Sequence, residues 1–82
     1  MSQLVWWPAA IRDLRKLDPP VARQVRDAIL RYAGSGQGDV KRLRSPDTGL
    51  RLRVGDWRVR FHIQPGGGLS IQRILHRSQA YR

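Results

Sequence analysis

Arginine alternates with apolar residues along one segment of the chain, a spacing typical of neighbouring β-strands. The polar positions of this segment are Arg51, Arg53, Arg58, Arg60 and His62. Gly55-Asp56 lies midway and predicts a two-residue turn, so the segment folds back as a hairpin with four guanidinium groups on one face. Guanidinium groups bind phosphate through paired hydrogen bonds. The spacing therefore predicts a phosphate-binding face.

The expected strand pairing puts these arginines opposite one another. Counting from the turn, Arg53 lies opposite Arg58, and Arg51 lies opposite Arg60. Like charges that face each other across two strands destabilise the pair, and none of these positions holds an Asp or Glu that would offset the repulsion. A ligand with negative charge explains this cost. The alternative explanation is a solvent-exposed face, where screening keeps the repulsion small.

The whole chain is strongly basic, and its charge is unevenly distributed. Its 82 residues include 16 Lys and Arg but only 6 Asp and Glu, which gives a formal net charge of +10. Residues 41–82 hold ten basic and two acidic side chains, a balance of +8, against +2 for residues 1–40. The charge indicates a negatively charged partner and directs the search for function to the second half of the chain.

Length and composition exclude several classes of protein. A chain of this size is expected to form one domain, spanning residues 1–82. The absence of Cys excludes a disulfide scaffold, and two His without any Glu argue against a hydrolytic metal centre, so we expect neither a metal nor another cofactor. No run of 18 apolar residues is present. We therefore expect no membrane span, no signal peptide and a location in the cytoplasm.

The first half of the chain predicts one strand and two helices. A strand over residues 3–7 ends at Pro8, which can open a helix because the first helical residue needs no N–H donor. Apolar residues then recur at helical spacing. Asp18 can cap a second helix that opens at Pro19 and ends at Gly34. The short connection predicts an antiparallel helical hairpin.

The second half has the period of two that strands require. Residues 40–43 predict a short strand, the arginine hairpin follows, and residues 69–75 predict a last strand in the sheet interior. In that strand we expect Leu75 on the same face as Ile71, and Ile74 on the other face. The expected fold class is α+β in the order β-α-α-β-β-β. The helical hairpin packs on one face of a small, twisted, largely antiparallel sheet, and the arginines occupy the other face.

Three segments of the chain resemble the RelE/ParE superfamily of bacterial and archaeal toxins of type II toxin–antitoxin systems. WPAAIRDLRKLDPPVARQVRDAI resembles the family's helical hairpin, VKRLRSPDTGLRLRVGDWRVRF its central strands, and ILHRSQAYR its C-terminal strand and tail. For the RelE branch, the resemblance implies an endoribonuclease that enters the ribosomal A site, cuts mRNA there and inhibits translation. It also implies a cognate antitoxin that wraps and neutralises the toxin, and the charge of +10 predicts that this antitoxin is acidic.

The resemblance also implies which residues form the site. By position, the family's basic catalytic residues and its tail residues correspond to Arg51, Arg53, Arg58, Arg77 and Tyr81. Arginine stands here where some relatives have lysine in the strands. From the predicted hairpin we expect RNA or phosphate contacts from Arg51, Arg60 and His62.

Cutting RNA without a metal requires charge at the phosphate and a group that moves protons. Attack of a 2′-OH on its own phosphate builds up negative charge, which we expect Arg58 to stabilise together with Arg53. Arginine is a poor base, so another residue moves the protons. Neighbouring positive charges favour the phenolate of Tyr81. The imidazole of His76 is the more conventional acid–base group, and both candidates stay open.

Two other functions are compatible with the same chain. Toxins of the ParE branch have a similar hairpin, but they inhibit DNA gyrase and need no catalytic residues. A non-catalytic RNA-binding or ribosome-binding module needs only the positive charge. Arg77 and Tyr81 in the tail, together with Arg58, favour the ribonuclease, and we expect Trp57 to pack into the core.

Overall fold

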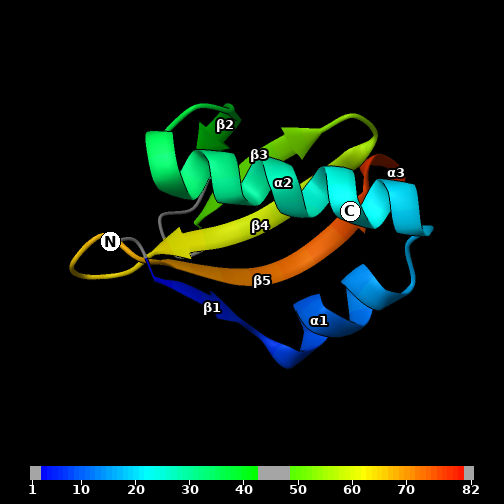
Figure 1. Cartoon of the computed structure of the whole chain (residues 1–82), viewed down its shortest axis with the longest axis horizontal. Helices are drawn as coiled ribbons and strands as arrows, with labels where there is room; N and C mark the ends of the chain where they lie inside the picture. Colours follow the sequence, from blue (N-terminus) through cyan, green and yellow to red (C-terminus); the bar gives the residue numbers. More distant parts are fainter. Residues whose placement is uncertain (1–2, 43–48, 81–82) are drawn as a thin grey trace.

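The computed structural model describes residues 3–42 and 49–80, apart from the side chain of Ala80. Its elements follow one another along the chain as shown in Figure 1. They are β1 (Leu4–Trp6), α1 (Pro8–Arg15), α2 (Pro19–Ser35), β2 (Asp39–Arg42), β3 (Leu50–Val54), β4 (Trp57–Ile63), β5 (Leu69–His76) and α3 (Arg77–Ala80). The predicted α+β class is confirmed. The expected order counted only three strands after the helices, although four segments were predicted as strands. The structure has four strands there, one for each of these segments, and a short last helix.

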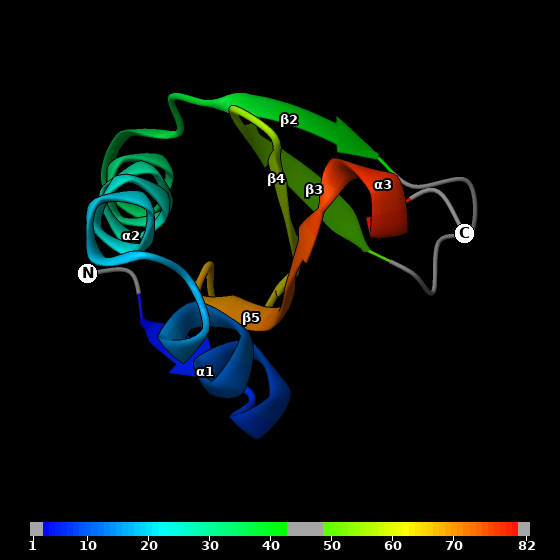
Figure 2. The ribbon, with the colours of Figure 1, turned by 90° about the vertical axis from the view of Figure 1, so that its right-hand side faces the viewer.

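The five strands form one sheet in the order β1-β5-β4-β3-β2. β1 runs parallel to β5, and the other neighbours are antiparallel. α2 crosses one face of the sheet, α1 lies alongside β5, and α3 lies on the face opposite α2 (Figure 2). β5 is therefore an interior strand where it pairs with β1, as predicted. Of the strand predicted over residues 40–43, Leu43 lies outside the described residues.

Prolines begin both long helices, and a glycine ends the second. Pro8 and Pro19 occupy first positions, as expected from their fixed φ. Asp18 stands at the N-cap of α2, but its side chain makes no capping hydrogen bond; Pro20 follows at the second helical position and has no N–H to donate. The predicted end at Gly34 is wrong. Gly36 ends the helix instead, because it is the residue that adopts a left-handed φ of 76°.

The core lies between α2 and the sheet. Val25 and Ile29 of α2 face apolar side chains from β3, β4 and β5, and all are almost completely buried. The rings of Tyr32 and Phe61 meet edge to face with centroids 5.3 Å apart. Trp57 packs against this core, as predicted.

A β-bulge in β5 changes which of its side chains reach the core. Phe61 pairs with Ile71 and Arg60 pairs with Arg73, so Gln72 is the extra residue between them. The extra residue shifts the alternation by one position. Ile74 therefore joins the buried core, and the expectation that Leu75 shares a face with Ile71 is wrong.

Helix α1 is attached to the edge of β5 through one carboxylate. Asp13 accepts hydrogen bonds from Nε of Arg73 at 2.8 Å and from the backbone amide of Ile74 at 2.9 Å. β1 pairs with residues 69–71 only, so Asp13 occupies the strand edge just beyond it. Burial alone raises the pKa of the Asp13 carboxyl, but the hydrogen bonds from Arg73 and Ile74 outweigh it and hold the pKa below its ordinary value of 3.8.

Candidate functional site

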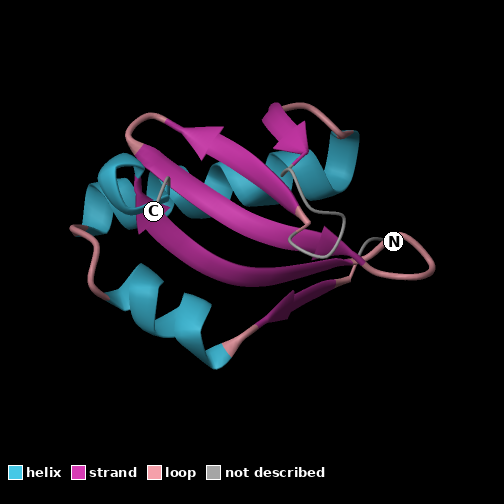
Figure 3. Ribbon diagram, turned by 180° about the vertical axis from the view of Figure 1, so that it is seen from behind, coloured by secondary structure: helices cyan, strands magenta, loops and turns pink. Residues whose placement is uncertain are grey.

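The hairpin pairs its residues as the sequence predicted. Val54 lies opposite Trp57, Arg53 opposite Arg58, and Arg51 opposite Arg60. Directly opposite residues share a face, so these four arginines lie together on the face that α2 leaves uncovered, toward the viewer in Figure 3. We refer to the basic side chains of this face as the arginine face. Its members are Lys41, Arg51, Arg53, Arg58, Arg60 and Arg73.

Two members of the arginine face were missed by sequence reasoning. Lys41 of β2 lies opposite Arg51, which the alternation of β2 could have indicated. Arg73 lies opposite Arg60 only because of the bulge in β5, and the local sequence pattern does not predict that bulge. Two carboxylates among the described residues form ion pairs with members of this face: Asp13 with Arg73 at 2.8 Å, and Asp39 with Arg53 at 3.9 Å.

Arg58 differs from the other members because it is buried. It is only 6% exposed, whereas the side chain of Arg53 opposite it is 62% exposed. Its Nη1 donates to the carbonyl oxygens of Gly55 at 2.8 Å and Trp57 at 3.0 Å. The hairpin turn therefore holds the guanidinium in one orientation. Within the described residues no carboxylate forms an ion pair with it, so its positive charge stays uncompensated.

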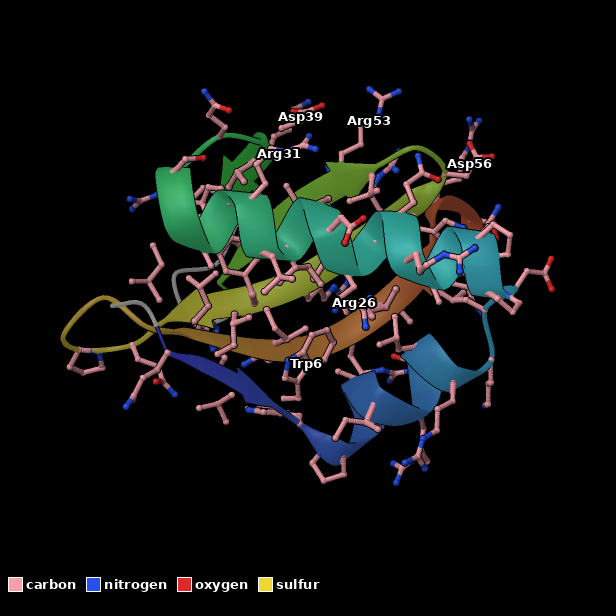
Figure 4. All side chains as sticks on the ribbon, viewed as in Figure 1. Trp6, Arg26, Arg31, Asp39, Arg53 and Asp56 are labelled. Atoms are coloured by element: carbon pink, nitrogen blue, oxygen red, sulfur yellow. The ribbon has the colours of Figure 1, made fainter. Side chains whose placement is uncertain are left out.

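The buried guanidinium opens onto a small hollow in the arginine face. The hollow is lined by Asp39, Lys41, Arg51, Arg53 and Arg58. Figure 4 shows Arg53 and Asp39 pointing away from α2 beside this region, with Asp56 at the hairpin turn. A fixed cation surrounded by exposed, adaptable cations can hold a phosphate and stabilise negative charge that develops on it. The sequence predicts the same chemistry for these residues, and it stays a prediction.

His62 lies at the far end of the same row and is held by two contacts. Its Nδ1 is hydrogen-bonded to Nε2 of Gln72, the extra residue of the bulge. Its ring lies over Gly49, where a Cβ atom would come within 2.1 Å of the ring. Gly49 also has a φ of 80°, so glycine is required there on two counts. His62 is half-buried and lies on the same side of β4 as Arg60, away from Arg58, and its contact with RNA stays a prediction.

The structure does not bring His76 to Arg58. His76 lies opposite Trp57, and the two rings meet edge to face with centroids 5.2 Å apart, whereas Arg58 lies opposite Leu75. Adjacent residues of a strand point to opposite faces, so His76 and Arg58 occupy different sides of the sheet. The register therefore does not place the His76 ring beside the Arg58 guanidinium.

Arg77 begins α3 and is attached to the hairpin turn. Its amide donates to the carbonyl oxygen of Asp56 at 2.7 Å, and its Nη1 lies 3.7 Å from the Asp56 carboxylate. The same two-residue turn thus holds Arg58 through Gly55 and Arg77 through Asp56. Tyr81, the other tail residue expected in the site, lies outside the described residues.

Cofactor and membrane features were expected to be absent from this chain. Across residues 3–42 and 49–80, no three His, Cys, Asp or Glu side chains gather as a group that could hold a metal ion. None of the helices in the same part of the chain is long and apolar enough to cross a membrane.

Comparison with known proteins places the chain in a family. Residues 4–81 match the family described as the ParE toxin of type II toxin–antitoxin systems, parDE. The chain belongs to the ParE toxin family. It is therefore a toxin of a type II toxin–antitoxin system, and the resemblance to the RelE/ParE superfamily is confirmed. A search of curated protein sequences gives no significant match.

The fold of this ParE-family toxin is shared with solved RelE structures. A chain of the RelB–RelE antitoxin–toxin complex from Methanococcus jannaschii superposes with a TM-score of 0.76 and 18% identity, covering 94% of each chain. The isolated Escherichia coli RelE toxin has a TM-score of 0.76 and 16% identity, covering 99% of this toxin and 92% of RelE. A chain of the RelBE2 toxin–antitoxin complex of Mycobacterium tuberculosis has a TM-score of 0.72 and 25% identity, covering 92% of this toxin and 96% of that chain. These matches confirm the RelE-like fold.

Proposed function

We propose that this toxin is a metal-independent endoribonuclease that cuts mRNA in the ribosomal A site and so inhibits translation. The observation that carries the proposal is Arg58, a buried guanidinium fixed by two backbone carbonyl groups and left without a carboxylate partner among the described residues. Burying a charge without a partner of opposite sign costs free energy. A phosphate that gains negative charge during cleavage would repay that cost.

In the proposed reaction, the 2′-oxygen of a ribose forms a bond to the adjacent phosphorus, and the bond from phosphorus to the 5′-oxygen breaks. The products are a 2′,3′-cyclic phosphate and a 5′-OH. Arg58 stabilises the charge on the non-bridging oxygens, and Arg53 closes on the phosphate from the opposite strand. Arg77, whose amide is bonded to the same turn, stabilises the leaving 5′-oxygen in this proposal. Tyr81 as phenolate takes the proton of the 2′-OH and, as phenol, returns one to the 5′-oxygen.

The remaining cations bind the RNA backbone. Arg51 and Arg60 lie opposite each other on the arginine face, and His62 continues the row toward the bulge. Contacts with phosphates hold the message in register without selecting a base. The ribosome supplies the rest of the binding energy, since the toxin acts on translated mRNA. This proposal places the protein in the cytoplasm.

The proposed partner that silences the toxin is a cognate acidic antitoxin. The similar structures from M. jannaschii, M. tuberculosis and Pyrococcus horikoshii were solved with RelB antitoxins or as a toxin–antitoxin complex. A net charge of +10 and an arginine face with few carboxylates favour an antitoxin segment that is rich in Asp and Glu.

Gyrase inhibition is the second candidate, because the family that matches is described by the name ParE. In that case the arginine face would bind without cutting, and Arg58 would serve only to brace the hairpin. A binding module without catalysis is the third candidate. Both alternatives predict that messages stay intact.

Expression of the toxin with translating ribosomes, followed by primer extension on mRNA, tests the proposal. We expect cuts inside codons of translated messages, and we expect Tyr81→Phe to lower single-turnover cleavage on programmed ribosomes by about 10²–10⁴-fold. Growth arrest with intact messages and relaxed or broken DNA would replace the ribonuclease with the gyrase inhibitor. Ribosome binding without any cut would favour the binding module.

A further inference from the structure

The last helix begins with two hydrogen bonds from backbone amides to side chains, and both involve His76. The Ser78 amide donates to Nδ1 of His76 at 3.3 Å, and the His76 amide donates to Oε1 of Gln79 at 3.3 Å. The Ser78 hydroxyl lies 3.0 Å from the same Nδ1. This resembles a capping box: the third helical residue, Gln79, accepts from the amide of the residue before the helix, while His76 accepts from the amide of the second helical residue, Ser78. An imidazole stands here in the place of the usual Ser or Thr hydroxyl.

The capped segment is fastened to the turn of the arginine hairpin. The Arg77 amide donates to the carbonyl oxygen of Asp56 at 2.7 Å, and the His76 ring packs edge to face against Trp57. The ion pair between Arg77 and Asp56 is exposed on both sides, and such pairs contribute little. The backbone hydrogen bond and the ring contact therefore make the attachment. Without the cap, the amides of His76 and Ser78 would lose their hydrogen-bond partners.

The turn that receives α3 is the turn that holds Arg58, through the carbonyl oxygen of Gly55. We propose that His76 and Gln79 are positioning residues, whose two capping hydrogen bonds fix α3 on the hairpin turn and thereby set Arg77 relative to Arg58. His76 moves no proton in this assignment. The inference rests on the proposed ribonuclease activity and deepens it. It assigns a positioning role to His76, which is otherwise the more conventional candidate for the base.

The geometry separates positioning from proton transfer. Nδ1 of His76 accepts from the Ser78 amide, so the neutral ring carries its proton on Nε2 in this arrangement. The register also places the ring on the Trp57 side of the strands, away from Arg58. A base needs a ring that titrates, whereas a cap needs only an acceptor at the right distance. Asparagine is among the strongest N-caps and does not titrate, so His76→Asn distinguishes the two roles.

Single-turnover cleavage by the full chain on programmed ribosomes is measured for four variants. His76→Ala and Gln79→Ala remove one half of the cap each, and we expect each to slow cleavage by roughly five- to tenfold, as for other lost caps. His76→Asn and Gln79→Glu keep an acceptor, and we expect both to recover to within about threefold of the wild-type rate. The double alanine variant should be about as slow as either single one, because both act through one cap. The pH profile should keep its shape in all of them.

Gln24→Ala, the same substitution at an exposed position of α2, is the matched control and should leave the rate unchanged. A proton carrier at position 76 predicts the opposite result: His76→Asn as slow as His76→Ala, a loss of about 10²–10⁴-fold, one limb of the pH profile missing and Gln79→Ala close to wild type. That result would overturn the inference.

Hydrogen exchange at the Ser78 amide keeps this test separate from that of the ribonuclease itself. If His76→Ala and Gln79→Ala speed exchange there and His76→Asn does not, the cap exists as described, even in a toxin that cuts no RNA. Unchanged exchange in both alanine variants would overturn the cap. Failure of the wild type to cut mRNA, with the exchange pattern intact, would instead overturn the ribonuclease and with it the catalytic purpose of the cap.

Discussion

Two arginines on the same face of the sheet are both held in place, but by different partners. Arg73, in the part of β5 that extends beyond β1, donates to the carboxylate of Asp13 at 2.8 Å. Arg58, at the start of β4, donates to two backbone carbonyl oxygens. A carboxylate cancels the charge of a guanidinium, whereas carbonyl dipoles orient it and leave its charge available. The comparison separates an arginine that fastens a helix from one that can act on a phosphate.

The largest expected effect is the loss of cleavage when Arg58 is replaced. Arg58→Ala should lower single-turnover cleavage by about 10²–10³-fold, because it removes a preorganised charge from the developing oxyanion. Arg73→Ala is the matched control on the same face, and its rate should fall less than tenfold in protein that remains folded. Equal losses at both positions would show that the face acts through its total charge and that the way each arginine is held is irrelevant.

The next effect concerns stability at the other arginine. Asp13→Ala should lower the free energy of unfolding by about 1–3 kcal/mol, since it removes hydrogen bonds to a charged group and to a strand-edge amide. Water around Arg73 should keep the loss near the lower end of this range. Urea unfolding measures it, with Asp39→Ala as control, because the ion pair between Asp39 and Arg53 is long and exposed. A loss at Asp39 as large as that at Asp13 would contradict the assignment.

A pH series sharpens the role of Asp13. Its pKa is lower in the folded protein than the ordinary value of 3.8, so the carboxylate adds stability that is complete above that value. This stability is lost as the pH falls through the folded pKa, below 3.8. The difference in free energy of unfolding between wild type and Asp13→Asn should therefore shrink from about pH 5 toward about pH 2. A difference that grows on acidification would mean that the sign of the pKa shift is wrong.

The smallest effect separates the rim of the arginine face from its buried centre. Arg51→Ala should reduce the salt dependence of binding to a single-stranded RNA by about 0.7 units of slope, the share of one phosphate contact. Arg26→Ala at an exposed position of α2 should leave the slope unchanged. Binding isotherms at several salt concentrations give both slopes. If the α2 variant loses as much as Arg51→Ala, the RNA lies on the helices and not on the arginine face.

Much of the fold follows from local signals in the chain. Gly55-Asp56 sets the register of the arginine hairpin, because a two-residue turn leaves one way of pairing the strands that it joins. Pro8 and Pro19 mark helix starts for a reason internal to the residue, its fixed φ and missing N–H. The end of α2 is harder to predict. Gly34 and Gly36 are both available, and the choice between them depends on where the chain must turn toward β2.

The candidate site could be predicted only in part. The alternation of β3 and β4 identifies Arg51, Arg53, Arg58 and Arg60 as sharing a face, and the register bears this out. The alternation cannot tell that Arg58 is buried while Arg53 is exposed, since both have the same place in the pattern. The alternation also cannot tell which side of the strand end the His76 ring occupies, because the bulge shifts the phase of β5 before that residue.

Sequence by itself determined the α+β class, the helix starts and the pairing of the hairpin, because turns, prolines and alternation act between near neighbours. Tertiary structure decided which arginine is fixed and which is neutralised. Asp13 meets Arg73 across 60 positions of the chain, and Gln72 shifts the phase of β5 only because β4 lies beside it. Arg58 is buried where β3, β4 and β5 come together. Burial and ion pairing depend on neighbours that only the packed chain brings into contact, and so these properties have no local signature.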